Sequence, residues 1–167
     1  MFFMKKSIVI LGLAFLYACS YSVFMNAYPH LRYIQIYPIE NSTSEFALGQ
    51  DLQNFLVEKF QSDGRLKIST LDPDCCIEGK VLDYRNEIFS YDMYGSVSEY
   101  RVSILLDITM TDLKRQTVMY ENKSLLQSVT YSPNASNPDL FITEAQAVDE
   151  VFLQVFNTIM RSTFEAW

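Results

Sequence analysis

The chain has 167 residues, of which 49% are hydrophobic and 20% are charged, and its formal net charge is −7 at pH 7. This length and apolar content suffice for a single domain with its own hydrophobic core. The acidic balance argues against nucleic acid as a partner, because affinity for a phosphate backbone comes largely from lysine and arginine.

The N-terminus has the features of a secretory signal. Lys5 and Lys6 precede an apolar run, Ile8 to Ala18, which is shorter than the roughly 20 residues that a membrane-spanning helix needs. The run ends in Leu16-Tyr17-Ala18-Cys19, which resembles a bacterial lipobox, where the cysteine thiol carries a diacylglycerol and becomes the first residue after cleavage. We therefore predict lipidation at Cys19; an ordinary cleaved signal is the alternative.

These features predict three segments: a signal peptide at residues 1–18, a lipidated tether at residues 19–31 and a folded domain at residues 32–167. The signal peptide holds two lysines and no acid, so its removal changes the net charge from −7 to −9. Two or more acyl chains would anchor the domain stably to a membrane. Ser20 follows the cysteine, where an aspartate would resemble an inner-membrane retention signal, and this favours the outer membrane.

The first part of the domain predicts a strand, a helix and a second strand. Residues 32–37 alternate in polarity, as in a strand. Ser42 and Glu45 have the spacing of a helix capping box, and Asp63-Gly64 is a typical helix end. Between them, apolar side chains repeat at helical spacing: Leu48, Leu52, Phe55, Leu56 and Phe60. A short strand is predicted from Leu66 to Ser69.

Two long strands are predicted next, at Cys76 to Ile88 and at Val97 to Thr111. The second alternates without a break, so one face should pack on a core while the other is wet or meets a partner. A further strand begins at Thr117, and a last helix spans about Thr143 to Phe164. The predicted fold class is α+β, with two helices on one face of a four- or five-stranded, mainly antiparallel sheet, an α/β sandwich.

No pattern in the sequence predicts catalysis, a metal site or a cofactor. The chain has one histidine, His30, and it lacks GxSxG, HExxH and a glycine-rich phosphate loop. Cys75 and Cys76 are adjacent, and neighbours in a strand point to opposite faces. We interpret them as small, partly buried residues at a strand start; a redox site, a metal site or a bridge to a partner chain is the alternative.

Several short motifs together resemble the LptE family of lipopolysaccharide-assembly lipoproteins over about residues 30 to 160. In chain order they are Asn41 to Ser44, Asp63-Gly64-Arg65-Leu66, Glu78-Gly79-x-Val81, Phe89 to Asp92 with Gly95, and Glu99-Tyr100-Arg101-Val102. The resemblance implies a protein that is not an enzyme and that lies at the periplasmic face of the outer membrane. There it would plug and help assemble an LptD-like β-barrel translocon that delivers lipopolysaccharide. A periplasmic ligand-binding or envelope-scaffold lipoprotein without a barrel partner is the alternative.

The segment between the two long strands is rich in amphipathic aromatic side chains. We predict that Phe89, Tyr91, Met93 and Tyr94 contact lipid or a partner; closure of the hairpin end against the protein's own core is the alternative. Family members carry basic residues near this tip and before the last helix, where this chain has Asp92, Met93 and Thr143. The candidates for binding lipopolysaccharide phosphates are therefore Arg85, Arg101, Lys114 and Arg115.

Overall fold

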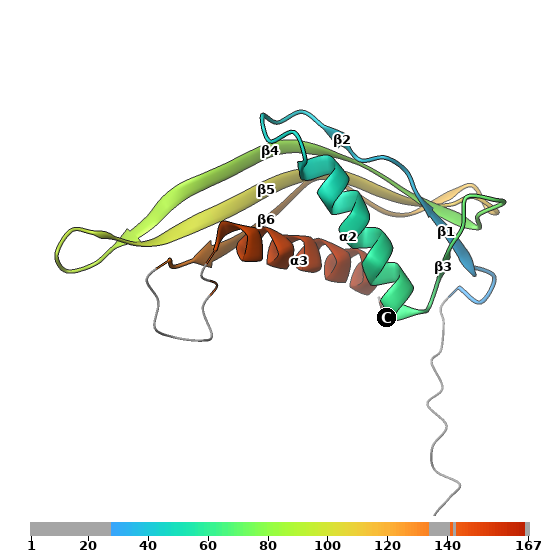
Figure 1. Cartoon of the computed structure of the whole chain (residues 1–167). Coiled ribbons are helices and arrows are strands. Elements are labelled where there is room, and N and C mark those ends of the chain that lie inside the picture. Colours follow the sequence, from blue (N-terminus) through green and yellow to red (C-terminus); the bar gives the residue numbers. More distant parts are fainter. Residues whose placement is uncertain (1–27, 134–140, 142, 166–167) are drawn as a thin grey trace, which may run out of the picture.

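The computed structural model describes residues 28–133, 141 and 143–165, so the predicted signal peptide and Cys19 lie outside the described residues. A long, curved sheet arches over two helices, which both lie on its concave face (Figure 1). The elements in chain order are β1 Tyr33–Ile36, β2 Glu40–Asn41, α2 Leu48–Asp63, β3 Lys67–Ile68, β4 Cys75–Tyr91, β5 Val97–Asp112, β6 Thr117–Tyr131 and α3 Glu144–Phe164.

The sheet contains six strands, and its main path runs β3-β1-β4-β5-β6, with β2 beside β4. The long β4–β5 and β5–β6 ladders are antiparallel, whereas the short strands β1, β2 and β3 pair in parallel. The predicted α+β class is confirmed, although the sheet is mixed and has one strand more than predicted. The additional strand is the two-residue β2, which is too short to give a periodic signal.

Helix α2 packs as its apolar spacing predicts, because Leu48, Leu52, Leu56 and Phe60 are all buried. It ends at Gly64, whose φ of 77° and hydrogen bond to Phe60 O form a left-handed cap. The predicted capping box at Ser42 is wrong: the helix begins at Leu48, after Ala47, without a side-chain cap. Instead, the Asn41 side chain organises the preceding loop through hydrogen bonds to Thr43 and to Glu45 O.

Helix α3 begins close to the predicted residue and has a capping box of its own. The Thr143 hydroxyl accepts a hydrogen bond from Gln146 N at 3.2 Å, and the Gln146 side chain accepts one from Thr143 N. Val155, Phe156 and Ile159 are buried, whereas Ala145 is exposed. The buried stripe of the helix begins at Ala147, because its first turn extends past the core.

The core fills the space between the helices and the concave face of the sheet. Alternate residues of β5 contribute one layer: Val102, Ile104, Leu106, Ile108 and Met110, each at most 1% exposed. The helices meet through two edge-to-face aromatic pairs, Phe60–Phe156 with centroids 5.1 Å apart and Phe55–Phe152 with centroids 5.6 Å apart. The apolar face predicted for β5 is therefore confirmed.

Two buried carboxylates hold together the end of the sheet from which the N-terminal segment emerges. Asp74 accepts hydrogen bonds from the backbone N–H groups of Arg32 and Tyr33 at 2.8 and 2.9 Å. Asp112 lies 2.5 Å from His30 Nε2 and also accepts from Arg115 N. Burial by itself would raise the pKa of both carboxyl groups, but these hydrogen bonds outweigh burial and lower it.

Asp74→Ala should lower the free energy of unfolding by about 1–3 kcal/mol at pH 7, because two backbone donors lose their acceptor in a buried place. The pKa of Asp74 is lower in the folded chain than its ordinary value of 3.8. Its stabilising effect is therefore complete above that value and declines as the pH falls through the folded-state pKa. We expect urea unfolding to show a smaller difference in the free energy of unfolding between the variant and the wild type at pH 3 than at pH 7. An unchanged difference would contradict this assignment.

Candidate functional site

The β4–β5 hairpin extends far beyond the helices and ends in a tight turn. Asp92 organises this turn, because one of its carboxylate oxygens accepts from Tyr94 N and Ser96 N at 2.8 and 2.9 Å. Asp92 N also donates to Ser96 O, and Gly95, at φ 82°, donates its N–H to Asp92 O. These polar groups of the turn are satisfied within it, so the side chains at the tip can meet an apolar surface without exposing unpaired backbone groups to it.

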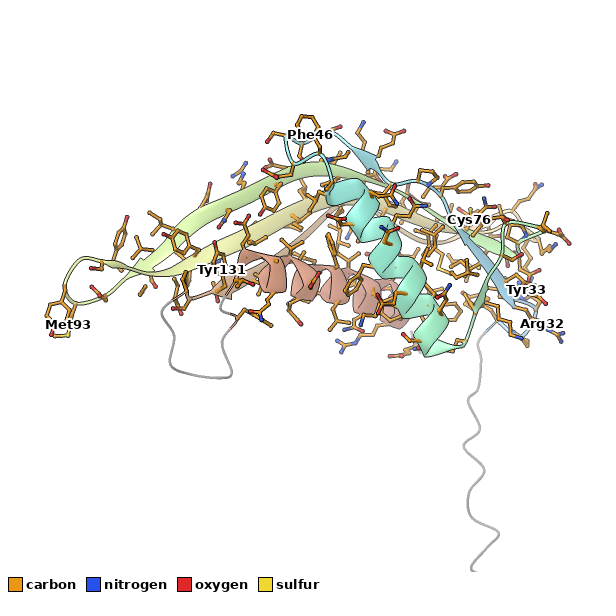
Figure 2. All side chains as sticks on the ribbon, viewed as in Figure 1. Arg32, Tyr33, Phe46, Cys76, Met93 and Tyr131 are labelled. Carbon is orange, nitrogen blue, oxygen red and sulfur yellow. The ribbon has the colours of Figure 1, made fainter. Side chains whose placement is uncertain are left out.

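The four predicted contact residues of the tip are exposed: Phe89 is 47%, Tyr91 62%, Met93 88% and Tyr94 84% accessible. Met93 lies at the far end of the molecule from Arg32 and Tyr33, where the described chain begins (Figure 2). The alternative, that these residues close the hairpin against the protein's own core, does not describe the structure. Their contact with lipid or a partner stays a prediction.

Two of the four predicted basic residues lie on the outer, convex face of the hairpin near this tip. Arg101 stacks over the Phe89 ring, with Cζ 3.6 Å from the centroid. Arg85 forms an ion pair with Asp83, with Nε and Oδ2 2.8 Å apart. In the β4–β5 register Arg101 stands opposite Glu87, so both cations have acidic neighbours.

The other two predicted basic residues, Lys114 and Arg115, lie in the β5–β6 turn at the opposite end of β5. Lys114 Nζ is 2.7 Å from Asp72 Oδ1 and 3.7 Å from Asp74 Oδ1, and these carboxylates raise its pKa. A 16-residue strand such as β5 is about 50 Å long. The structure therefore separates the four basic residues into two distant pairs and does not form a single phosphate site from them.

The convex face of the sheet carries no described helix (Figure 1). The residues that stand side by side across β4, β5 and β6 on this face are mostly polar, for example Glu87, Arg101 and Thr130, or Arg85, Ser103 and Ser128. Near its middle Leu105 pairs with Leu126, which is 60% exposed. A convex, mostly polar face with a small apolar centre has the shape and chemistry to dock into a concave partner.

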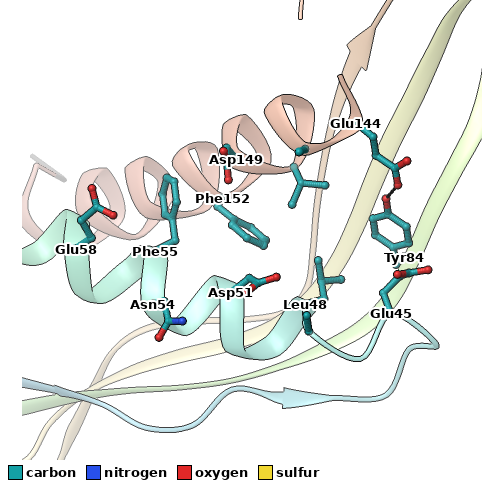
Figure 3. A pocket seen from close by; sticks show the side chains of 13 residues that line it. Glu45, Leu48, Asp51, Asn54, Phe55, Glu58, Tyr84, Glu144, Asp149 and Phe152 are labelled. Carbon is teal, nitrogen blue, oxygen red and sulfur yellow. Dashed lines mark hydrogen bonds between the residues drawn. The ribbon is translucent and has the colours of Figure 1, made fainter. Parts of the chain in front are cut away.

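A groove of about 630 Å³ opens between the diverging N-terminal halves of α2 and α3 (Figure 3). Five carboxylates line it: Glu45, Asp51, Glu58, Glu144 and Asp149. Its apolar lining includes Leu48, Phe55, Val148 and Phe152, and none of the described lining residues is lysine, arginine or histidine. Tyr84, from β4, donates a hydrogen bond to Glu144, and its pKa is raised because burial and this carboxylate both oppose ionisation.

The acidic lining makes this groove unsuitable for the phosphates of lipopolysaccharide. The groove was not predicted, although the sequence contains one signal of it: Asp51 and Glu58 are seven residues apart and so lie on one face of a helix. What the sequence lacked was the angle between α2 and α3, which depends on long-range packing.

The two adjacent cysteines are buried and unpaired, which agrees with the interpretation of small residues at a strand start. Cys75 begins β4 and belongs to the core, and burial raises its pKa to about 12. A thiol with so high a pKa is a poor nucleophile and a poor metal ligand at neutral pH. Within the described residues no group of three or more His, Cys, Asp or Glu side chains could hold a metal ion.

None of the helices in the described part of the chain combines the length and the apolar character needed to cross a bilayer.

Two solved structures with TM-scores above 0.5 support the fold. Protein XCC0632 from Xanthomonas campestris is 12% identical, with a TM-score of 0.52, over 79% of this chain and 85% of its own. The hypothetical protein CT253 from Chlamydia trachomatis is 8% identical, with a TM-score of 0.51, over 77% of this chain and 98% of its own. Rare lipoprotein B from Shewanella oneidensis is 15% identical, with a TM-score of 0.46, over 77% of this chain and 92% of its own. No curated protein sequence matches the chain.

The family comparison is more specific than these likenesses. The family model for lipopolysaccharide assembly, LptE, matches residues 31–163, which include every described helix and strand almost to the end of α3. The same region contains the motifs on which the resemblance in the sequence was based, and the predicted family is confirmed. The chain therefore belongs to the LptE family of lipopolysaccharide-assembly lipoproteins.

Proposed function

We propose that this protein is an outer-membrane lipoprotein, anchored at the periplasmic face through Cys19, that plugs and helps assemble an LptD-like β-barrel translocon for lipopolysaccharide. It performs this role by docking and without catalysis. The proposal is carried by one observation: a convex sheet face that no described helix covers and a projecting aromatic hairpin occur together on a chain of this family (Figure 1). A convex body with one protruding arm is complementary to the interior of a hollow partner.

The charges of the chain favour a role in the barrel over independent capture of lipopolysaccharide. The groove between the helices is acidic, and the four basic candidates lie in two pairs at opposite ends of β5. Arg85 and Arg101 are the better placed pair for a phosphate, because they share the convex face near the tip. We propose that they contact lipopolysaccharide only once the barrel supplies further cations.

Extraction of membranes in mild detergent, with the acyl chains intact, tests the proposed partnership. We expect a stoichiometric complex with a large outer-membrane β-barrel protein, and we expect depletion of the chain to leave that barrel misassembled. Recovery of a monomer, together with a barrel that folds and exports lipopolysaccharide normally, would refute the proposal. That result would favour the alternative of a ligand-binding or scaffold lipoprotein.

Cys19→Ser should release the protein from membranes in cells that are depleted of the barrel partner, because the variant has neither acyl chains nor a docked neighbour. We expect most of the variant in the soluble periplasmic fraction, measured by fractionation and immunoblotting. Ser22→Ala is the matched control, since it changes a nearby residue and keeps the cysteine. A Cys19→Ser variant that stays with the membrane in the depleted cells would show that the anchor is elsewhere.

A further inference from the structure

Strand β6 forms one edge of the sheet, and among the described residues most of this edge has no neighbouring strand. It comes last in the strand order and pairs with β5 on one side only. Within the described residues, pairing on its other side is confined to one isolated bridge from Tyr131 to Phe141, beside a hydrogen bond from Ser132 N to Phe141 O. Alternate backbone N–H and C=O groups from Thr117 to Thr130 therefore point away from the sheet.

The two halves of this edge differ in regularity and charge. From Leu125 to Tyr131 the strand pairs with β5 residue by residue, without a register shift. This half reads LLQSVTY and contains no charged residue and no proline. The half from Thr117 to Ser124 has register shifts and carries the Glu121–Lys123 ion pair at 3.3 Å. Exposed sheet edges are often protected by charges, proline or bulges. The half from Thr117 to Ser124 has two of these protections, and the half from Leu125 to Tyr131, called the unprotected half below, has none of the three.

The unprotected half is also held rigidly in a strand conformation. Leu125 and Val129 are buried against the core, and the Tyr131 ring stacks on Tyr100 with centroids 5.4 Å apart. The Gln127 side chain donates to the Thr158 hydroxyl of α3 at 3.4 Å. On the convex face Leu126 is 60% exposed. A pre-ordered edge lowers the entropic cost of adding another strand.

We infer that the outer edge of β6 from Leu125 to Thr130 binds an extended, otherwise unpaired segment of the partner protein by strand addition. The chemistry selects an extended polypeptide, because only an extended backbone matches a row of alternating donors and acceptors. The inference rests on the proposed function, which supplies the partner. Strands within a closed barrel wall have no free edge, so the segment would be a loop or a terminus.

A second copy of this chain is the less favourable occupant of the edge. Without the predicted signal peptide each chain carries a net charge of −9, and two copies side by side would repel each other. A neutral or basic segment of another protein does not have this cost.

The test compares two double variants that add the same charge to exposed positions of the same strand. Leu126→Lys with Ser128→Lys places lysines beside the unprotected half, and Val118→Lys with Ser124→Lys places them beside the protected half. The full-length lipoproteins are expressed in cells and extracted in mild detergent. We expect the first variant to recover at least tenfold less partner complex, and the second to stay within twofold of the wild type. Equal thermal unfolding of the two variants excludes misfolding as the cause. Because Leu126 also lies on the convex face, hydrogen exchange separates strand addition from docking through that face.

Hydrogen exchange reports strand addition directly. In the purified wild-type complex we expect alternate amides from Leu125 to Thr130 to exchange at least tenfold more slowly than in the free protein, with no such change from Thr117 to Ser124. Unchanged exchange at Leu125 to Thr130, or full complex recovery by the first variant, would overturn the inference and leave the proposed function intact. Absence of any complex with the wild type would overturn both. Protection of the edge in a homodimer would show that the occupant is a second copy, and would also overturn the inference.

Discussion

Phe60→Ala should lower the free energy of unfolding by about 3–5 kcal/mol, a large part of the 5–15 kcal/mol that stabilises an ordinary domain. The Phe60 side chain is 0% exposed, and its ring packs edge-to-face on Phe156 of α3. This pair joins the two helices near the ends at which they converge, so the loss of one ring leaves a cavity that neither helix can close without moving. Equilibrium unfolding in urea, followed by circular dichroism, measures the effect.

Phe46→Ala is the matched control for this prediction. The same ring is removed, but Phe46 is 96% exposed and lies on the loop before α2 (Figure 2). We expect its effect to stay within about 0.5 kcal/mol, as is usual for surface substitutions. Similar losses in the two variants would mean that the contact between the helices is not what stabilises the fold.

Met93→Ser combined with Tyr94→Ser should reduce recovery of the barrel complex at least tenfold while leaving the stability of the domain unchanged. Both side chains are more than 80% exposed at the hairpin tip, so the free protein loses little when they are shortened. In a complex they would be buried, and aromatic anchors of this kind often contribute 2 kcal/mol or more to binding. Co-purification from mild detergent measures recovery of the complex, and urea unfolding of the isolated protein measures its stability.

Phe46→Ser combined with Leu71→Ser is the control for the tip. These residues are 96% and 84% exposed, so the variant removes a similar apolar area elsewhere on the surface. We expect it to recover the complex within about twofold of the wild type. If both double variants lose the complex equally, the decrease comes from the loss of exposed apolar area in general and is not specific to the tip. If neither loses it, the tip is not a contact with the partner.

The sequence predicted those helices and strands that have one face on the core and the other in solvent, because their apolar residues then recur at a regular spacing. Strand β5 has one face on the core and one face open, and its alternation gave nearly the correct bounds. Helix α2 buries one stripe, and its spacing and Gly64 located it. The start of α2 was predicted incorrectly because Ser42 and Glu45 imitate a capping box, while the local hydrogen bonds come from Asn41. Competition between nearby polar side chains of this kind is not visible in spacing alone.

The candidate site was predictable in its residues and less so in its arrangement. The aromatic residues at the end of the β4–β5 hairpin predicted a contact with lipid or a partner, but their spacing alone left closure against the core as an alternative. The separation of Arg101 from Lys114 also follows from the length of β5. The groove and the free edge of β6 could not be predicted, because the first depends on the angle between two helices and the second on strand order. Both are set by contacts between residues far apart in the sequence.

The two ends of the molecule have a mechanical consequence. The N-terminal segment joins the sheet at β1, next to the start of β4, and the hairpin tip lies at the other end of β4 and β5 (Figure 2). A pull between those ends would act along the strands, and the pairing that carries the load is the short parallel one between β1 and β4. Its residue pairs would have to slide past one another together, in shear, and could not separate one at a time. The body is thus suited to carry tension between the proposed lipid anchor at Cys19 and a partner bound to its tip.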